Sequence, residues 1–154
     1  SMPDPFYLHT QPLISAESAL KAKTGVVIAN TDSLDKNQLQ QQSDFYMYCR
    51  QKGLWPNEVS GHDPAEEPEW FAQYEARKNV TPSYPPTLLL HGEKDTDVPF
   101  HQSLLMAKAL AIQGVEHQLI SQSHWEHVFD HQEDDPTVIK AHNRVLGFLD
   151  RHLK

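Results

Sequence analysis

The chain has 154 residues, enough for one domain of modest size. Its formal net charge of -8 argues against a nucleic-acid partner, because phosphate binding needs a concentrated basic face. No apolar run resembles a signal sequence or reaches transmembrane length, and the single cysteine, Cys49, permits no internal disulfide. Composition therefore indicates a soluble, acidic protein without membrane segments, and it fits a reducing compartment such as the cytoplasm.

The first third of the chain predicts helices and irregular segments. Ser1-Met2 resembles a remnant of tag cleavage and is set aside. Residues 3–12 contain three prolines and predict an irregular lead-in. Ser15 is a suitable N-cap for a short helix that ends near Gly25, and residues 26–29 could form a brief extended piece.

The segment up to residue 80 continues in the same way. Residues 33–52 predict a helix that Gly53 terminates, and residues 54–68 are rich in turn-forming residues. The acidic run at residues 66–69 indicates a short helix with a charged first turn before Trp70-Phe71. Residues 3–80 therefore predict helices and loops without a convincing strand ladder.

The chain is organised around residues 84–100. Thr87 to Leu90 form an apolar or β-branched run without alternation, which is typical of a parallel strand buried on both faces. Gly92 ends this run, so Asp95 and Asp97 follow at the carboxyl end of the strand. Open α/β sheets place their chemistry at that edge.

A second strand and two helices complete the chain. Residues 102–112 predict a helix with Leu105, Ala109 and Ile112 on one face, and Gly114 closes it. Residues 116–121 predict a strand, and the last helix begins at Asp135-Pro136, with Val138, Ala141, Val145 and Leu149 along one face. The strand-helix-strand crossover makes the two strands parallel neighbours, so residues 93–100 and 123–130 should meet at one sheet edge.

The motif from His91 to Pro99, reading His-Gly-Glu-Lys-Asp-Thr-Asp-Val-Pro, resembles the acid-bearing loop of α/β-hydrolases of the dienelactone hydrolase and prolyl oligopeptidase type. The resemblance implies that Asp95 is the acid of a Ser-Asp-His triad. Residues 126–130 are similar to the histidine loop of the same enzymes, which implies that His127 is the base, although Val128 replaces the common glycine. We call residues 93–100 the acid loop and residues 123–130 the histidine loop.

Other residues compete for these roles. Asp97 is the alternative acid, with a turn or cap role if it is not catalytic, and His124 is the alternative base. His91 ends the strand and is expected to be a partly buried histidine with satisfied hydrogen bonds. A metal site would have to draw on His124, Glu126, His127, Asp130, His131 and Glu133, but a loop does not give them helical spacing, so neither a metal nor a cofactor is expected.

The expected nucleophile has no counterpart in these residues. No Gly-x-Ser-x-Gly elbow precedes Asp95, and Cys49 lies in a predicted helix. The resemblance implies the carboxyl-terminal half of an α/β-hydrolase: a mostly helical, cap-like region (3–80), in which residues 45–61 resemble a cap, followed by a strand-helix-strand-helix core (81–154). The earlier strands, the oxyanion hole and the nucleophile would then lie upstream of residue 1.

This reading sets the expected function. The chain is a partial, truncated serine esterase or peptidase, inactive alone, that would act on an ester or peptide substrate only when it is completed. The alternative is a non-catalytic, self-associating or binding module derived from the hydrolase scaffold. A two-stranded sheet leaves unpaired edges, so a homo-oligomer or a missing amino-terminal half is expected as partner.

Overall fold

The computed structural model describes residues 5–23 and 34–153, and the chain divides into two compact units, residues 1–71 and 72–154. The extended piece predicted at residues 26–29 lies outside the described residues. The helix predicted to end near Gly25 ends earlier, at Leu20, with Lys21 as its C-cap. Within the described ranges, no helix combines the length and apolar character needed to cross a membrane.

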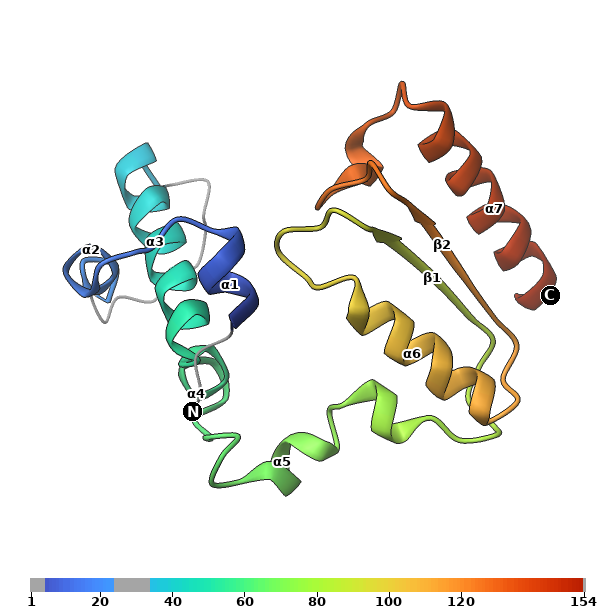
Figure 1. Cartoon of the computed structure of the whole chain (residues 1–154), viewed down its shortest axis with the longest axis horizontal. Helices are drawn as coiled ribbons and strands as arrows, with labels where there is room; N and C mark the ends of the chain where they lie inside the picture. Colours follow the sequence, from blue (N-terminus) through green and yellow to red (C-terminus); the bar gives the residue numbers. More distant parts are fainter. Residues whose placement is uncertain (1–4, 24–33, 154) are drawn as a thin grey trace. The chain divides into compact units, whose positions relative to one another are not determined.

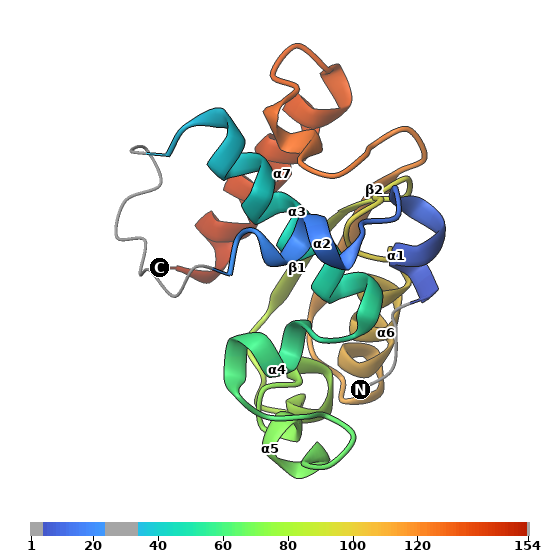
Figure 2. The ribbon, with the colours of Figure 1, turned by 90° about the vertical axis from the view of Figure 1, so that its left-hand side faces the viewer.

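The first unit is built from helices. Figures 1 and 2 show α2 beside the longest of them, α3. No strand is present among the described residues of this unit, as the sequence predicted. The helices are α1 (Pro5–Thr10), α2 (Ala16–Leu20), α3 (Lys36–Lys52), α4 (Trp55–Ser60) and α5 (Pro68–Ala72), the last of which ends at the start of the second unit.

Local sequence signals set the ends of α3. Asp35 and Gln38 form a capping box, in which each side chain accepts a hydrogen bond from the other residue's backbone N–H. Gly53 ends the helix with φ of 69°, a left-handed conformation that glycine adopts without steric cost. The predicted stop at Gly53 is confirmed, whereas the helix begins after Asp35 and not at Ser33.

The prediction of an irregular lead-in over residues 3–12 was wrong for the part that forms α1. Pro5 occupies the first helical position, where the missing N–H costs nothing. Tyr7 is fully buried, and the guanidinium of Arg50 in α3 lies 3.9 Å from the centroid of its ring. Packing against α3 therefore stabilises a helix that its own sequence would not sustain.

A buried amide ties the segment between α1 and α2 to α3. Gln51 is 1% exposed, and its side chain donates a hydrogen bond to the Pro12 carbonyl (2.7 Å) and accepts one from the Ile14 N–H (3.1 Å). These bonds satisfy backbone groups of a segment that lacks regular structure. The burial of Gln51 could not be predicted, because a polar residue in a polar helix carries no sequence signal of burial.

The second unit holds the predicted strand-helix-strand-helix core. Figure 1 shows α6 and α7 on opposite faces of a pair of strands. The first strand is longer than the predicted run from Thr87 to Leu90, because His91 and Gly92 also belong to it. The elements are η2 (Ala76–Asn79), β1 (Thr87–Gly92), α6 (His101–Ile112), β2 (His117–Gln122), η3 (Phe129–His131) and α7 (Pro136–His152).

The sheet is parallel and is covered on both faces, as the unalternating strand predicted. Thr87 pairs with His117, and the register runs without a bulge to Gly92 opposite Gln122. On one face, Leu88 and Leu90 join a core with residues of α7. On the other face, Leu89 joins a core with residues of α6. Alternate side chains of one strand therefore serve two cores.

The buried faces of both helices agree only in part with the predicted faces: Ala109, Val138 and Ala141 pack inward as predicted. In α6 the buried residue is Leu110, with Met106 and Ala109 packed beside it, whereas Ile112 is 71% exposed. This helix is apolar on most sides, so periodicity could not select its inner face. In α7 Val138, Ala141 and Phe148 are buried, and Leu149 is 41% exposed, so Phe148 takes the place predicted for Leu149.

A close backbone contact joins the end of β1 to the histidine loop. The Lys94 N–H donates to the Trp125 carbonyl at 3.0 Å. A Cβ atom at Gly92 would lie 2.7 Å from the carbonyl carbon of Trp125 and 2.8 Å from the Glu126 oxygen, both shorter than real contacts of this kind. Gly92 is therefore required because it lets the two chain segments approach, and its φ plays no part.

We predict that Gly92→Ala lowers the free energy of unfolding by about 1–3 kcal/mol, since the added methyl group forces backbone atoms apart. Gly147→Ala is the matched control, because a Cβ there meets no atom within 4 Å and an exposed helical position favours alanine over glycine. Chemical denaturation of both variants measures the difference. Equal stability of the two variants would contradict the close-contact argument.

Candidate active site

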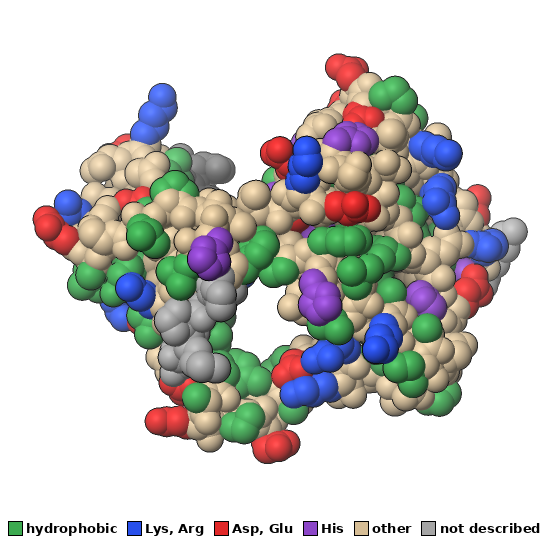
Figure 3. Space-filling view, in the orientation of Figure 1, with side chains coloured by type: hydrophobic (Ala, Val, Ile, Leu, Met, Phe, Trp, Pro, Cys, Tyr) green, Lys and Arg blue, Asp and Glu red, His purple; other side chains and the backbone are tan. Residues whose placement is uncertain are grey.

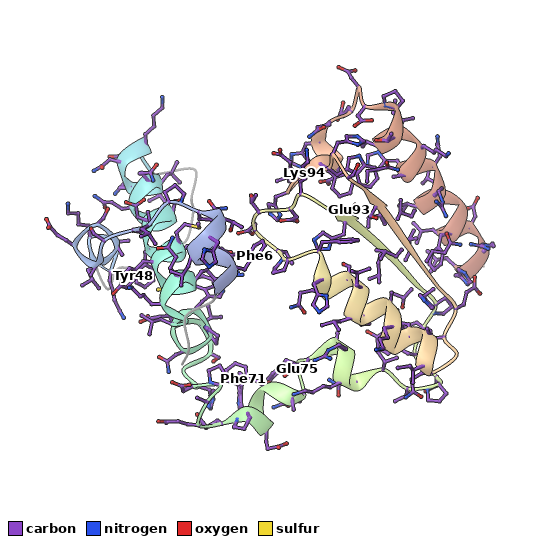
Figure 4. All side chains as sticks on the ribbon, in the orientation of Figure 1. Phe6, Tyr48, Phe71, Glu75, Glu93 and Lys94 are labelled. Atoms are coloured by element: carbon purple, nitrogen blue, oxygen red, sulfur yellow. The ribbon has the colours of Figure 1, made fainter. Side chains whose placement is uncertain are left out.

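The end of β1, the acid loop and the histidine loop line a shallow cavity. Its volume is about 290 Å³, and its lining includes Asp95 and residues 127–130. Figure 3 shows acidic and histidine side chains gathered over this end of the strands. Figure 4 places Glu93 and Lys94 in the turn that follows β1, beside the histidine loop. Both predicted triad members therefore lie at the predicted sheet edge.

The carboxylate of Asp95 is oriented by its own loop. One oxygen, Oδ1, accepts hydrogen bonds from the backbone N–H groups of Asp97 and Val98, each at 2.8 Å. The Asp95 side chain is only 9% exposed. Because two backbone donors hold it, the carboxylate has one orientation before any partner arrives.

The His127 ring meets this carboxylate edge-on. Nδ1 of His127 lies 3.2 Å from Oδ1 and 3.1 Å from Oδ2 of Asp95. An ionised carboxylate only accepts, so Nδ1 carries the proton and donates. The ring is 46% exposed, and Nε2 is left on the side away from Asp95. This is the tautomer and orientation that a triad requires of its histidine.

A buried tryptophan supports the histidine loop. Trp125 is fully buried, stacks on Phe129 with ring centroids 4.0 Å apart, and donates from Nε1 to the Thr137 hydroxyl at 2.9 Å. These contacts anchor the loop to the start of α7 on both sides of His127. An aromatic residue such as Trp125 in an otherwise polar loop is a sequence signal that could have indicated this anchor.

His91 supports the acid loop from behind. Its side chain is 9% exposed, Nε2 donates to the Val98 carbonyl at 3.0 Å, and Nδ1 accepts from the Ser103 hydroxyl at 2.6 Å. Nε2 also lies 3.4 Å from Oδ2 of Asp95. The expectation that His91 is a buried, satisfied histidine is confirmed, and its bonds connect β1, the acid loop and α6.

The pair shifts the pKa values of both groups toward their charged forms. Burial has the largest single effect on Asp95 and would raise its pKa, but hydrogen bonds from the Val98 N–H, from His127 and from the Asp97 N–H outweigh burial and lower it. The hydrogen bond to Asp95 is the main cause that raises the pKa of His127, and the charges of Asp95, Asp97 and Asp130 add to it against partial burial.

The alternative residues occupy different places. His124 lies 3.0 Å from Oδ2 of Asp135 at the start of α7, where its Nε2 is also near the Thr137 hydroxyl, so its partner is not Asp95. The pKa of Asp135 is lowered to about 2, mainly by hydrogen bonds from the Thr137 hydroxyl and backbone N–H. Asp97 faces the other side of His127, with Oδ2 3.5 Å from Nε2. The structure thus pairs Asp95, and not Asp97, with Nδ1.

Val128 adopts the conformation that the replaced glycine would have favoured. Its φ is 57° and its ψ 31°, and no other non-glycine residue of the described ranges has a positive φ. A β-branched residue is strained in this left-handed region. The histidine loop therefore carries local backbone strain at Val128.

No metal centre is evident in the part of the chain that the structure describes. Over residues 5–23 and 34–153, no three histidine, cysteine or acidic side chains converge as metal ligands. The side chains of the predicted cluster have other contacts, as His124 has with Asp135 and His127 has with Asp95. The arrangement at the cavity is suited to moving a proton at Nε2 of His127.

Fold and site together define a class of protein. A parallel α/β core with an acid after one strand and a histidine after the next is typical of the carboxyl-terminal part of an α/β-hydrolase. The model of the prolyl oligopeptidase family matches residues 27–154, and the chain belongs to this family. The chain matches no curated protein and no solved structure.

We predict that Val128→Gly raises the free energy of unfolding by about 0.5–1 kcal/mol, because the relief of left-handed strain exceeds the extra entropy that glycine loses. Little packing is lost, since Val128 is 50% exposed. Ile139→Gly is the matched control: Ile139 is β-branched and 48% exposed, but it lies in α7, so glycine there should destabilise. Destabilisation of similar size by both substitutions would contradict the strain argument.

We predict that the Asp95–His127 pair stabilises the fold most between about pH 4 and about pH 6.5, the ordinary pKa values of the two groups. Because the pKa of Asp95 is lowered in the folded protein, its contribution to stability is lost as pH falls through that folded-state pKa. Because the pKa of His127 is raised, its contribution to stability is lost as pH rises through its folded-state pKa.

Thermal denaturation across this pH range measures the effect as the difference in Tm between the wild type and Asp95→Asn. His127→Gln is the control. It should still lose stability at acid pH as Asp95 is protonated, but it should no longer lose stability at alkaline pH, because no histidine titrates there. A difference that keeps growing with pH above the histidine titration would contradict the pairing.

Proposed function

We propose that the second unit supplies the acid and the base of a serine-hydrolase triad that cleaves ester or peptide bonds. The observation that carries the proposal is the 3.1 Å contact between Nδ1 of His127 and Asp95 at the cavity. Asp95 is held by two backbone donors and His127 by an anchored loop, so the pair is preorganised. Membership of the prolyl oligopeptidase family supports this assignment.

In the proposed reaction, a serine hydroxyl attacks the carbonyl carbon of the substrate. Nε2 of His127 accepts the hydroxyl proton and later returns it to the leaving group. Asp95 keeps the proton on Nδ1 and stabilises the imidazolium that forms, without becoming protonated itself. The reaction described in this way requires no metal and no cofactor.

The nucleophile and the oxyanion hole are proposed to come from a polypeptide segment outside these 154 residues. No Gly-x-Ser-x-Gly motif precedes Asp95 in the sequence. Without a nucleophile hydroxyl to deprotonate, His127 cannot act as a general base. The loss of even one oxyanion-hole donor costs about 2.7–4 kcal/mol of transition-state stabilisation. The isolated chain is therefore proposed to be inactive.

The specific alternative is a non-catalytic module that associates with itself. It is favoured by the sheet, because β1 pairs only with β2 within the described residues and two strands alone are marginally stable. An unpaired strand edge can accept a strand from a second copy. The cap-like role of residues 3–80 stays a prediction from the resemblance under either proposal.

We predict that co-expression with the amino-terminal half of a prolyl oligopeptidase relative, bearing the nucleophile elbow, produces hydrolysis of a small activated ester. Asp95→Asn should reduce kcat by about 10⁴-fold, since it leaves the imidazole in the wrong tautomer, and His127→Ala should reduce it at least as much. His124→Ala is the matched control and should retain activity, because His124 pairs with Asp135.

Two results would contradict the proposal. Turnover by the chain alone that persists in His127→Ala would show that another group acts as base. A complex that forms but stays inactive, together with light scattering that shows a stable homo-oligomer of the free chain, would favour the self-associating module.

A further inference from the structure

Both ring nitrogens of His127 face a carboxylate. Nδ1 lies 3.1 Å from Asp95, and Nε2 lies 3.5 Å from Oδ2 of Asp97. The two carboxylates come from the same loop, two residues apart, and the hydrogen bond from the Asp97 N–H to Asp95 at 2.8 Å fixes their spacing. The acid loop therefore holds the ring from two sides.

Carboxylates on both sides favour one charge state of the ring. A neutral imidazole has one N–H donor, so it can serve only one of the two carboxylates, whereas an imidazolium serves both. A triad base must instead present an unprotonated Nε2 to the nucleophile. Asp97 thus faces Nε2, the nitrogen to which the nucleophile would bind. It favours the protonated ring, which cannot act as a base.

We propose that Asp97 is a positioning residue that takes the place of the nucleophile on Nε2 of His127 until the hydroxyl displaces it. The displacement of Asp97 by a hydroxyl rests on the proposed function. The contact between Asp97 and Nε2 is independent of that function. When the hydroxyl docks, Asp97 leaves Nε2, the Nε2 proton passes to solvent, and the ring remains bound to Asp95 through Nδ1.

The exposed fractions of Asp95, Asp97 and His127 are consistent with a contact between Asp97 and His127 that can break. Asp95 is 9% exposed and cannot leave without breaking its backbone bonds, whereas Asp97 is 25% and His127 46% exposed. At 3.5 Å, the Asp97 contact is longer than a good hydrogen bond. Solvent screening keeps such a pair weak, so a hydroxyl that makes a direct hydrogen bond can replace it.

The other charged groups around the ring allow a matched control. Asp97 and Asp130 both raise the pKa of His127 through their charge, Asp97 more strongly, and His91 lies behind Asp95. Asp97→Asn and Asp130→Asn therefore remove the same charge near the same ring. Only the first removes the group that faces Nε2.

The experiment is an NMR titration of the imidazole nitrogens in the ¹⁵N-labelled full chain, with His127 assigned from His127→Gln. In Asp97→Asn, the titration midpoint of His127 should fall by more than in Asp130→Asn, and the remaining proton should stay on Nδ1. Asp95→Asn should instead abolish the Nδ1 preference. A midpoint in Asp97→Asn that moves no further than in Asp130→Asn would overturn the proposal.

The complemented enzyme separates this inference from the proposed function. There, Asp97→Asn should shift the acid limb of the pH profile of kcat/KM to lower pH. If the NMR shifts appear but no complemented enzyme is active, the proposed function fails and the contact stands. If activity appears and the acid limb of Asp97→Asn coincides with that of the wild type, the inference fails alone.

Discussion

The contact between the end of β1 and the histidine loop is the constraint on which the site depends. Gly92 leaves room for the backbone at Trp125, and the Lys94 N–H closes the contact with a hydrogen bond to the Trp125 carbonyl. The indole of the same residue is fully buried between Phe129 and the start of α7. One residue therefore joins the acid loop, the histidine loop and the core. Side chains on either loop can be placed accurately because the backbones beneath them are fixed.

The acid loop holds His127 through contacts that lie entirely within the second unit. Asp95 accepts hydrogen bonds from two backbone N–H groups in addition to the one from His127. His91 supports the loop through hydrogen bonds with Val98 and Ser103. Preorganisation of this kind lowers the entropic cost of holding the two side chains in one geometry. Strain at Val128 is consistent with the same demand, since a backbone turn suited to glycine is kept although the side chain opposes it.

The two units are stabilised by different means. The helical unit relies on capped helix ends and on a few buried polar or aromatic groups, such as Gln51 and Tyr7. The second unit places two apolar cores on opposite faces of a two-stranded sheet. A sheet of two strands has little hydrogen-bonded backbone of its own, so α6 and α7 supply most of the burial that stabilises it.

The sequence by itself determined the order of elements in the core and the pairing of the site. Four unalternating residues from Thr87, the stop at Gly53 and the cap at Asp135 are local signals, and the crossover between parallel strands places Asp95 near His127 whatever the details of packing. The family motif added the choice of Asp95 over Asp97, and the structure brings Asp95 to Nδ1.

Only the tertiary structure decided what depends on contacts between distant residues. Helix α1 is stabilised by the burial of Tyr7 against α3, a contact that the local sequence does not reveal. The inner face of α6 is set by the sheet that it covers, since its apolar residues surround the helix. The need for Gly92, the anchor at Trp125 and the contact of Asp97 with Nε2 arise where two loops meet in space, which a linear pattern does not record.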